Sequence, residues 1–529
     1  MSLNWSSTVA SDVAARWTAE EPGGVLLAFD RHAIRIVATG GLASLSHRRA
    51  ITADTRLRFA SLTKHIFCAF ALGHGLDPRE TLGAMLPDLT GDLATVTAGQ
   101  ALGMSGGIPD LSPSHTLCGV PPGLALDGAA LDAFTRELPG LDNPPGTEIS
   151  YSNTGYRLVE QGLARRGAIF RDWVEGPLNA ALGTGLRYPS GWDTPLPDLA
   201  DGHWRDSPAS GWRAGSYGMA LSASGALTGS ATDLALWLQA LLRGDGPAGA
   251  VLSRLATPGV LEDGTVSAYG LGLALMEIGG RRWIGHGGHL PGFKSHFLLD
   301  AEAGAGVLLL SNREDTDPLL PALRVLASLL GVELPSPATA LLPEGLFVED
   351  AGPAWIEHRA GQLTFLGARE ALFAAPDGAA FALSPYLPMH LHPEADGIAG
   401  TIGHVPRHFH PVAEGASTAA FAGRWRSTRP WLDLSIEMTP EGVAMAAMGN
   451  GPLRRPVPLT ALDERRALMP VGAMPWPGRA CLWLETPNRL RICTNRSRVI
   501  CLERTGGGPQ PPRLQASPSG YPRRPSLQR

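Results

Sequence analysis

A serine and a lysine three positions apart, Ser61 and Lys64, form the strongest chemical signal in the chain. Residues 61–72 are apolar at helical spacing, so the two side chains should share one helix face, with Cβ atoms about 5–6 Å apart. A serine hydroxyl becomes a nucleophile when a neighbouring base takes its proton, and a lysine made neutral by burial can be that base. On their own, Ser61 also fits a helix N-cap and Lys64 a solvated side chain.

The choice of basic residues supports the chemical interpretation. Of 44 lysines and arginines, only Lys64 and Lys294 are lysine. Arginine keeps its proton in proteins, so a chain that uses arginine almost everywhere and retains a lysine indicates a need for an amine that can become neutral. We expect Lys294 to be a solvated strand residue with at most a minor contact to substrate.

Two further segments carry groups that suit the same reaction. Tyr151 and Asn153 follow a Pro-Gly turn and precede a helical run, which places Tyr151 on a loop, where a phenol beside a lysine can pass a proton to a leaving amine. Farther along, His286, Gly287, Gly288 and His289 lie in a predicted strand. Glycines there allow close backbone approach, so a substrate could pair with the strand edge while His286 donates to its carbonyl or carboxylate. Each segment alone also fits ordinary structure: a loop aromatic with a helix cap, and a tight turn.

The elements that must position these residues are those of a mixed α/β domain. A helix-like opening is followed by two strands that suit an antiparallel hairpin, a long helix-rich middle, and a return to strands. This order favours an antiparallel sheet with a helical insert. The ranges are 6–20 for the first helix, 25–29 and 33–37 for the hairpin, and 281–284, 293–299 and 306–311 for the later strands.

The remainder of the chain has a different sequence pattern. After a Pro-rich linker near residue 334, short strand-like runs alternate with Gly, Pro and Asp, which favours small antiparallel barrels. We predict a catalytic domain at 1–333 and barrels at 343–414 and 418–506. Residues 507–529 are rich in Pro, Gly and Arg, and we expect them to be disordered.

Two other patterns suggest different chemistry. Residues 103–107 match the Gly-x-Ser-x-Gly nucleophile elbow at Ser105, but the following Ile-Pro-Asp does not suit the helix that this motif requires, so we interpret the match as fortuitous. Five histidines crowd together in the first predicted barrel, which makes a zinc site conceivable. Prolines interrupt the group, and we favour surface histidines over a metal site. They are His390, His392, His404, His408 and His410.

Taken in order, the three motifs resemble those of the penicillin-recognising serine hydrolases, the family of β-lactamases and DD-peptidases. That family has Ser-x-x-Lys at a helix start, Tyr-x-Asn on a loop, and a basic residue with glycine on a strand, which His286–Gly288 matches in a His-x-Gly form. The resemblance covers residues 20–315. It implies a β-lactamase-like α/β domain, followed here by the two barrels.

The resemblance also implies roles for the residues. Ser61 would form an acyl-enzyme, Lys64 or a Tyr151 phenolate would take its proton, and Tyr151 would protonate the leaving amine. Asn153 and His286 would orient the substrate. The strand segment Gly287, Gly288 and His289 would hold the substrate, and backbone N–H groups at Ser61 and beside Gly288–His289 would stabilise the oxyanion.

The layout is most similar to the D-aminopeptidase branch of this family, in which a loop of the last barrel enters the active site and an aspartate on it holds the substrate's amino group. The matching segment here, residues 469–478, contains no acid. We therefore expect another acceptor for the ammonium, with Glu485 and Asp463 as candidates. The expected substrate is a peptide or amide with an N-terminal D-residue. Alternatives are a D-Ala-D-Ala carboxypeptidase, a β-lactamase, an esterase or a catalytically silent ligand-binding protein.

Composition excludes several classes of partner. The net charge of −5 gives no drive toward nucleic acid or anionic membrane, and no apolar run is long enough to span a bilayer. The N-terminus lacks the pattern of a secretory leader, and the five cysteines form no Cys-x-x-Cys pair. These features predict a soluble, cytoplasmic protein with free thiols. We expect no metal or organic cofactor, and the related branch makes a homodimer plausible.

Overall fold

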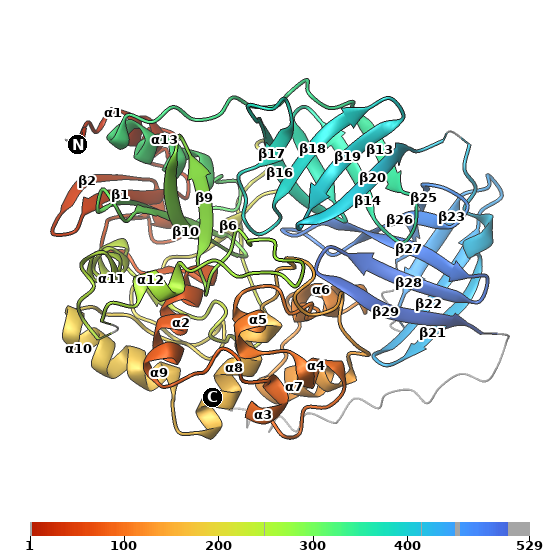
Figure 1. The fold of residues 1–529 in the computed structure, drawn as a ribbon, viewed down its shortest axis with the longest axis horizontal. Helices are drawn as coiled ribbons and strands as arrows, with labels where there is room; N and C mark the ends of the chain where they lie inside the picture. The colour runs from red at the N-terminus through yellow and green to blue at the C-terminus, as the bar shows by residue number, and fades with distance from the viewer. Residues whose placement is uncertain (1–2, 248, 414, 450–454, 506–529) are drawn as a thin grey trace, which may run out of the picture.

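The computed structural model describes residues 3–247, 249–413, 415–449 and 455–505. The chain forms an α/β domain, then a closed barrel, then a nine-stranded sheet that curls into a nearly closed barrel, as Figure 1 shows. The fold class expected from the sequence is confirmed. The tail predicted to be disordered, residues 507–529, lies outside the described residues.

A six-stranded antiparallel sheet is the frame of the α/β domain, in the order β2-β1-β12-β11-β10-β9. Its central strand β12 reads Ala-Gly-Val-Leu-Leu-Leu-Ser and is buried along its whole length, because helices cover both faces of the sheet. The predicted hairpin is present, with Gly24 opposite Gly40. The strands are β1 (Gly24–Asp30), β2 (Ile34–Gly40), β9 (Ala274–Ile278), β10 (Arg281–Leu290), β11 (Phe293–Asp300) and β12 (Ala305–Ser311).

Two pairs of helices cover this sheet. On one face lie α2 (Thr63–Gly73) and α11 (Ala231–Arg243), and on the other lie α1 (Thr8–Ala14) and α13 (Leu319–Leu330). The expectation of a helix over residues 6–20 is wrong in length, since α1 ends at Ala14. There the chain tightens into turns that bring Trp17, only 8% exposed, against the sheet. Helix α11 begins at a capping box of Ser230 and Asp233.

The helix-rich middle of the chain packs beside α2 and holds the loop with Tyr151. Short strands β5 (Leu57–Arg58) and β8 (Thr228–Gly229) connect this region to the start of α2. Its helices are α3 (Leu82–Met85), α4 (Asp92–Thr95), α5 (Ala98–Leu102), α6 (Leu111–Leu117), α7 (Gly128–Glu137), α8 (Thr154–Arg165), α9 (Phe170–Trp173), η2 (Val174–Leu178), α10 (Asn179–Leu182) and α12 (Leu252–Leu255). Minor strand pairs are β3 (Leu42–Ser44) with β4 (Arg49–Ala50), and β6 (His203–Trp204) with β7 (Arg213–Ala214).

Both barrels follow the alternation of inward apolar and outward polar residues that antiparallel strands require. In β20, for example, Phe409 is fully buried between the outward His408 and His410. The first barrel contains β13 (Gly345–Glu349), β14 (Trp355–Arg359), β15 (Gln362–Phe365), β16 (Ala368–Ala374), β17 (Ala380–Ala382), β18 (Met389–Glu394), β19 (Gly397–Ile402) and β20 (Val405–Pro411).

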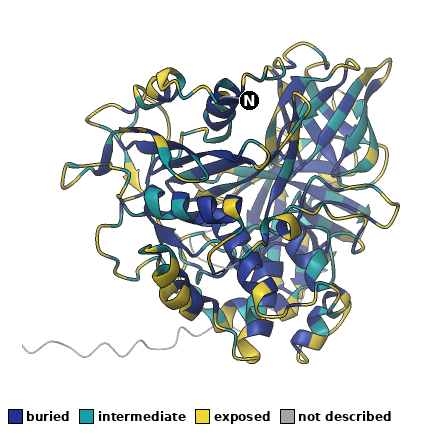
Figure 2. Cartoon of the chain, turned by 60° about the vertical axis from the view of Figure 1, so that its left-hand side comes forward, coloured by how far each residue is buried: buried dark blue, intermediate teal, exposed yellow. Residues whose placement is uncertain are grey.

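The second barrel begins after a short 3-10 turn, η3 (Ala419–Phe421). Its strands are β21 (Gly423–Thr428), β22 (Trp431–Met438), β23 (Ala444–Met448), β24 (Val457–Pro458), β25 (Thr460–Ala461), β26 (Arg466–Val471), β27 (Gly478–Thr486), β28 (Arg489–Thr494) and β29 (Ser497–Arg504). Figure 2 shows buried residues concentrated in the sheet and barrel strands, and exposed ones in outer loops and helix surfaces.

The start of β29 docks the second barrel onto the loop that precedes Tyr151. Arg498 forms a two-bonded ion pair with Glu148, at 2.8 and 2.9 Å, and both side chains are almost fully buried. The backbone N–H of Arg498 donates to Asp142, and burial raises the pKa of that carboxyl to about 7. This charged interface fixes the second barrel at the edge of the site described next.

Two global expectations can be compared with the structure. All five cysteines are free thiols, as predicted. Among the described residues, no helix is both long and apolar enough to cross a membrane.

Candidate active site

Ser61 lies in a single 3-10 turn, η1 (Ala60–Leu62), immediately before α2. The preceding Ala60 has a φ of 52°, in the left-handed region that an L-residue with a Cβ adopts only at a cost of about 1–2 kcal/mol. This sharp turn leaves Ser61 half-exposed at the wall of a cavity while its neighbours Ala60 and Leu62 are buried. Ser61 therefore lies just before the first residue of α2, one turn ahead of Lys64, as the sequence predicts.

The Lys64 amine is fully buried and contacts three oxygen atoms. Its Nζ lies 2.9 Å from the Oγ of Ser61, 2.7 Å from the Oδ1 of Asn153 and 2.6 Å from the carbonyl oxygen of Ser224. Burial lowers the pKa of Lys64 well below its ordinary value, although the nearby Asp110 carboxylate opposes the shift. The structure thus brings together Ser61, Lys64 and Asn153.

Tyr151 completes this group from the loop before α8. Its hydroxyl donates to the Oγ of Ser61 over 2.8 Å, and the Lys64 amine lies 5.0 Å from the centre of its ring. Burial raises the pKa of Tyr151, so the phenol is protonated at rest. The hydroxyl of Ser61 therefore has a phenol on one side and an amine on the other.

Asp110 holds Asn153 in place, and it was not among the residues predicted to form the site. Its Oδ2 accepts hydrogen bonds from the backbone N–H and the side-chain amide of Asn153, which fixes the amide with its Oδ1 toward Lys64. The same carboxylate caps α6 through the N–H of Ser112. The sequence feature that could have identified Asp110 is its position at the end of the Gly-Ile-Pro-Asp segment, directly before a helix.

Arg496, from the β28–β29 turn of the second barrel, is a second residue that the sequence did not indicate. Its guanidinium pairs with Asp110 and lies 4.7 Å from the centre of the Tyr151 ring. The backbone joins the same contact, because the Asp110 N–H donates to the Arg496 carbonyl over 2.8 Å. As one of 42 arginines, Arg496 carries no local signal of its place.

His286 lies behind the site, fully buried, rather than exposed to the cavity. Its Nδ1 faces the Gly287 carbonyl at 2.6 Å, and its Nε2 lies 2.8 Å from the hydroxyl of Tyr269. Because a carbonyl can only accept, we assign the ring proton to Nδ1, and Tyr269 donates to Nε2. Burial lowers the pKa of His286 well below its ordinary value, so the ring is neutral.

Gly287, Gly288 and His289 form the wall of β10 that faces the cavity. A Cβ added to Gly288 would meet the carbonyl oxygen of Phe59 at 2.4 Å, so glycine is needed for β10 to approach the turn that carries Ser61. The N–H of Gly287 donates to the hydroxyl of Tyr386, which reaches the site from the first barrel.

The segment 469–478 enters the same cavity, and Trp476 is its principal contact. The indole N–H of Trp476 donates to the Nε2 of His289 over 2.8 Å. Beside it lies Glu314, which contacts His289, accepts the Gly292 N–H over 2.8 Å, and lies 3.5 Å from the Nζ of Lys294. Lys294 is thus paired with an acid rather than simply solvated.

The two acids considered as acceptors for a substrate ammonium lie elsewhere. Glu485 pairs with Arg489 and Arg491 inside the second barrel, and Asp463 pairs with Arg466. Neither lines the cavity, so this expectation is wrong. Their strand neighbours within the barrel already neutralise them, and Glu314 is the acid beside the glycine-rich strand.

The cavity has a volume of about 960 Å³ and receives walls from all three parts of the chain. Ser61, Tyr151 and His289 come from the α/β domain, Tyr386 from the first barrel and Trp476 from the second. A pocket of this size suits a small molecule or a short peptide rather than a folded protein.

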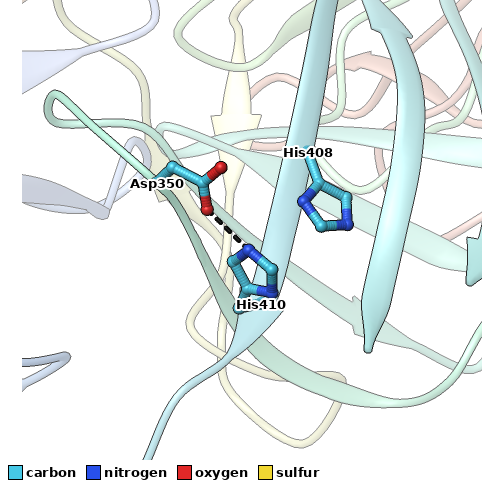
Figure 3. A group of neighbouring side chains, drawn as sticks. All are labelled: Asp350, His408 and His410. Atoms are coloured by element: carbon cyan, nitrogen blue, oxygen red, sulfur yellow. Dashed lines mark ion pairs between the residues drawn. The ribbon is translucent and has the colours of Figure 1, made fainter. Parts of the chain in front are cut away.

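The remaining motifs lie outside this cavity. Ser105 sits in a loop between α5 and α6, with no helix directly after it. Histidines on the outside of the first barrel lie in three groups with acids. In Figure 3 His410 pairs with Asp350 while His408 lies beside them. His408 also groups with Glu394 and Asp396, and the third group is Asp377, His390 and His392. The ligand atoms of each group lie within 4.8 Å of one another, so these are the residues that could hold a metal.

Comparison with known proteins agrees with this geometry. The beta-lactamase family matches residues 9–331, more than half of the chain. A D-aminopeptidase of Brucella ovis is 28% identical over 362 residues, which cover 64% of this chain and 68% of the relative.

Two solved structures share the fold. An octameric penicillin-binding protein homologue from Pyrococcus abyssi has a TM-score of 0.53 at 16% identity and covers 94% of this chain and 99% of its own. A D-amino acid amidase from Ochrobactrum anthropi SV3 has a TM-score of 0.50 at 24% identity and covers 61% and 97%. The chain therefore belongs to the beta-lactamase family of serine hydrolases.

Proposed function

We propose that the protein is a serine amidase or peptidase in which Ser61 attacks the substrate carbonyl. The observation that carries this proposal is the burial of the Lys64 amine within 2.9 Å of the Ser61 hydroxyl. Attack forms a bond from Oγ to the carbonyl carbon while the Ser61 proton passes to Lys64. Collapse expels the amine, and water then releases the acid and restores Ser61.

The contacts of Lys64 support a neutral amine as the resting base. Asn153 Oδ1 and the Ser224 carbonyl can only accept, so they take the two protons of an –NH₂ group. The lone pair is left for the proton of Ser61. Tyr151 then donates to Ser61 and remains a phenol at rest, which places it to protonate the departing amine.

Two backbone N–H groups suit the oxyanion of the tetrahedral intermediate. One belongs to Ser61 in the turn η1 before α2, and the other to His289 on the part of β10 that lies against this turn. A donor of this kind contributes about 3–4 kcal/mol to the rate of such reactions. The glycine at 288 supports the arrangement, since it permits the close approach of the two segments.

The substrate we propose is a peptide or amide with a free N-terminal D-residue, on the basis of the similarity to D-aminopeptidases. Such a substrate needs an acceptor for its ammonium, and the loop 469–478 offers none. Glu314 fits this role because it lines the cavity next to His289 and its side chain is only 14% exposed. A substrate ammonium there would share the carboxylate with Lys294, whose Nζ lies 3.5 Å away.

Replacement of the nucleophile and the base tests the reaction. Ser61→Ala and Lys64→Arg should each lower kcat by at least about 10³-fold, because arginine keeps the charge but cannot give up a proton. Acylation is measured by intact mass after mixing with an activated ester or amide, and folding by circular dichroism. A folded Lys64→Arg protein with wild-type acylation would contradict the neutral-amine mechanism.

Substrate selection is tested with D-alanine p-nitroanilide, its L-isomer and its N-acetyl form. The wild-type protein should favour the free D-amine. Glu314→Gln should lower kcat/KM for the free amine by about tenfold or more while sparing the N-acetyl form, since a charged hydrogen bond contributes about 1.5–3 kcal/mol. Preference for the acetylated compound by the wild-type protein would exclude an aminopeptidase.

A further inference from the structure

Strand β10 has an open edge beside the candidate nucleophile. Strand β9 pairs with it only from Arg281 to Gly285, whereas β11 follows it from Ile284 to Leu290. In the described part of the chain, the stretch from His286 onward therefore has one edge without a β-strand partner. An extended peptide could extend the sheet there by pairing with backbone groups of alternate residues.

Two N–H groups of β10 point to that edge. Gly287 stands opposite His296, and its N–H turns away from β11 toward Tyr386. Backbone groups in an antiparallel ladder alternate in direction, so the N–H of His289, two residues on, points to the same side. A peptide added as a strand would need both donors.

Tyr386 already occupies the first of these donors. It lies in the connection between β17 and β18, and its hydroxyl oxygen stands where the carbonyl oxygen of an added strand would accept. Its ring packs edge-on against Tyr151, with centres 5.4 Å apart, and lies 5.0 Å from the ring of His286. A Cβ at Gly287 would lie 3.4 Å from the hydroxyl and 3.0 Å from His296, so glycine keeps this contact uncrowded.

We propose that Tyr386 of the first barrel is a specificity-determining residue that caps the open edge of β10 and restricts the enzyme to short substrates. Because Tyr386 occupies the Gly287 N–H, the N–H of His289 is the one of these two edge donors that remains. The proposed mechanism assigns that N–H to the oxyanion. A substrate then gains no ladder of main-chain hydrogen bonds, so amino-acid amides and very short peptides are favoured over extended ones. The inference rests on the proposed serine amidase or peptidase function.

The test compares substrates of increasing length. D-alanine amide, di-D-alanine and tetra-D-alanine are assayed for the release of free D-alanine or ammonia, and kcat/KM is determined for each. In the wild-type protein kcat/KM should fall as the chain lengthens. Tyr386→Ala should raise the ratio of kcat/KM for the tetrapeptide over the amide by at least tenfold.

Tyr386→Phe separates the hydroxyl from the ring and guards against a misfolded alanine variant. It frees the Gly287 donor but keeps the ring, so the same ratio should rise by a smaller factor, about threefold. Tyr217→Phe removes a hydroxyl from another wall of the cavity, where it contacts the sulfur of Met219, and should leave the ratio unchanged.

The outcomes are distinguishable. A wild-type protein that hydrolyses the tetrapeptide as efficiently as the amide, or folded Tyr386 variants with the wild-type ratio, would overturn the role of Tyr386 while leaving the serine hydrolase intact. A wild-type protein that forms no acyl-enzyme at Ser61 with an activated ester would instead overturn the proposed function, and the inference with it.

Discussion

The two barrels reach the same cavity but touch different chemical groups. The second barrel places Arg496 against the Tyr151 ring and the Asp110 carboxylate, which in turn holds Asn153. The first barrel places Tyr386 against the backbone of β10. Through Arg496 the second barrel thus contacts side chains that we propose move protons, whereas the hydrogen bond of Tyr386 from the first barrel is made with the strand that we propose holds the substrate.

This difference suggests that the C-terminal domains have separate tasks. Changes in the contacts of the second barrel with Tyr151 and Asp110 should alter rate and pH dependence, since charge at that position acts on ionisable groups. Changes at Tyr386 should alter the range of substrates, since a capped backbone donor acts on binding. The following predictions test this division.

The largest effect is expected from the ion pair that docks the second barrel. Arg498→Leu removes the two-bonded partner of the buried Glu148 and leaves that carboxylate with Arg407 at 3.5 Å, so it should cost up to about 3–5 kcal/mol. The β28–β29 turn should then lose its fixed position, so kcat should fall by at least tenfold and denaturant-induced unfolding should lose cooperativity. Arg491→Leu is the matched control, because it breaks an ion pair within the same barrel and should keep most of the activity. An Arg498→Leu protein with wild-type kcat would show that docking is unnecessary.

A smaller and more specific effect is expected from Arg496→Met. The Arg496 guanidinium lowers the pKa of Lys64, so its removal should raise that pKa. In the proposed mechanism the attack needs neutral Lys64, so the acidic limb of the kcat/KM profile should move to higher pH. A shift of one pKa unit lowers the active fraction about tenfold on that limb. Arg496→Lys, which keeps a positive charge, should shift the limb less.

Asp110→Asn tests the sign of the same argument. The Asp110 carboxylate raises the pKa of Lys64, so its removal should move the acidic limb to lower pH, opposite to Arg496→Met. The two profiles are measured with one substrate and at constant ionic strength. Shifts in the same direction would show that Arg496 and Asp110 act through structure rather than through charge on Lys64.

The candidate catalytic group was predictable because each of its motifs is local in the sequence. Ser61 and Lys64 are one helical turn apart, and Tyr151 and Asn153 sit on one loop before a helix. Each pair alone also fits ordinary structure, and the resemblance of the three motifs in order is what grouped them. The central sheet was predictable for the same reason, since the run at residues 306–311 is apolar throughout. Local pattern failed at the first helix, where turns follow Ala14 and Trp17 packs against the sheet.

The resemblance predicted that the loop 469–478 enters the cavity, and it does. The contacts of Arg496 and Tyr386 were not predictable, because docking of the barrels creates them. Arg496 is 386 positions from Asp110, and Tyr386 is 99 from Gly287. An arginine in a hairpin turn and a tyrosine between two strands have no local pattern that separates them from others of their kind. The same limit explains the error over Glu485 and Asp463: the sequence shows acids near the correct loop, but strand pairing decides which arginines neutralise them.

The smallest effect is expected from Trp476→Phe. This variant tests whether the effect of a residue depends on the barrel that carries it or on the group in the cavity that it contacts. Trp476 belongs to the second barrel, yet it donates to His289 on the strand that we propose holds the substrate. Phenylalanine keeps the ring against Tyr217 and loses one hydrogen bond, which contributes about 0.5–1.5 kcal/mol.

If the contacted group decides the effect, the loss of the contact with His289 in Trp476→Phe should raise KM by about two- to tenfold and leave kcat and the pH profile unchanged. Steady-state kinetics across pH distinguish this from the behaviour of Arg496→Met, and Trp431→Phe on the exposed surface of the same barrel is the control. A shifted pH profile in Trp476→Phe would mean that any change in the second barrel, wherever it contacts the cavity, affects Lys64 and Tyr151. Tasks would then be divided by domain rather than by contact.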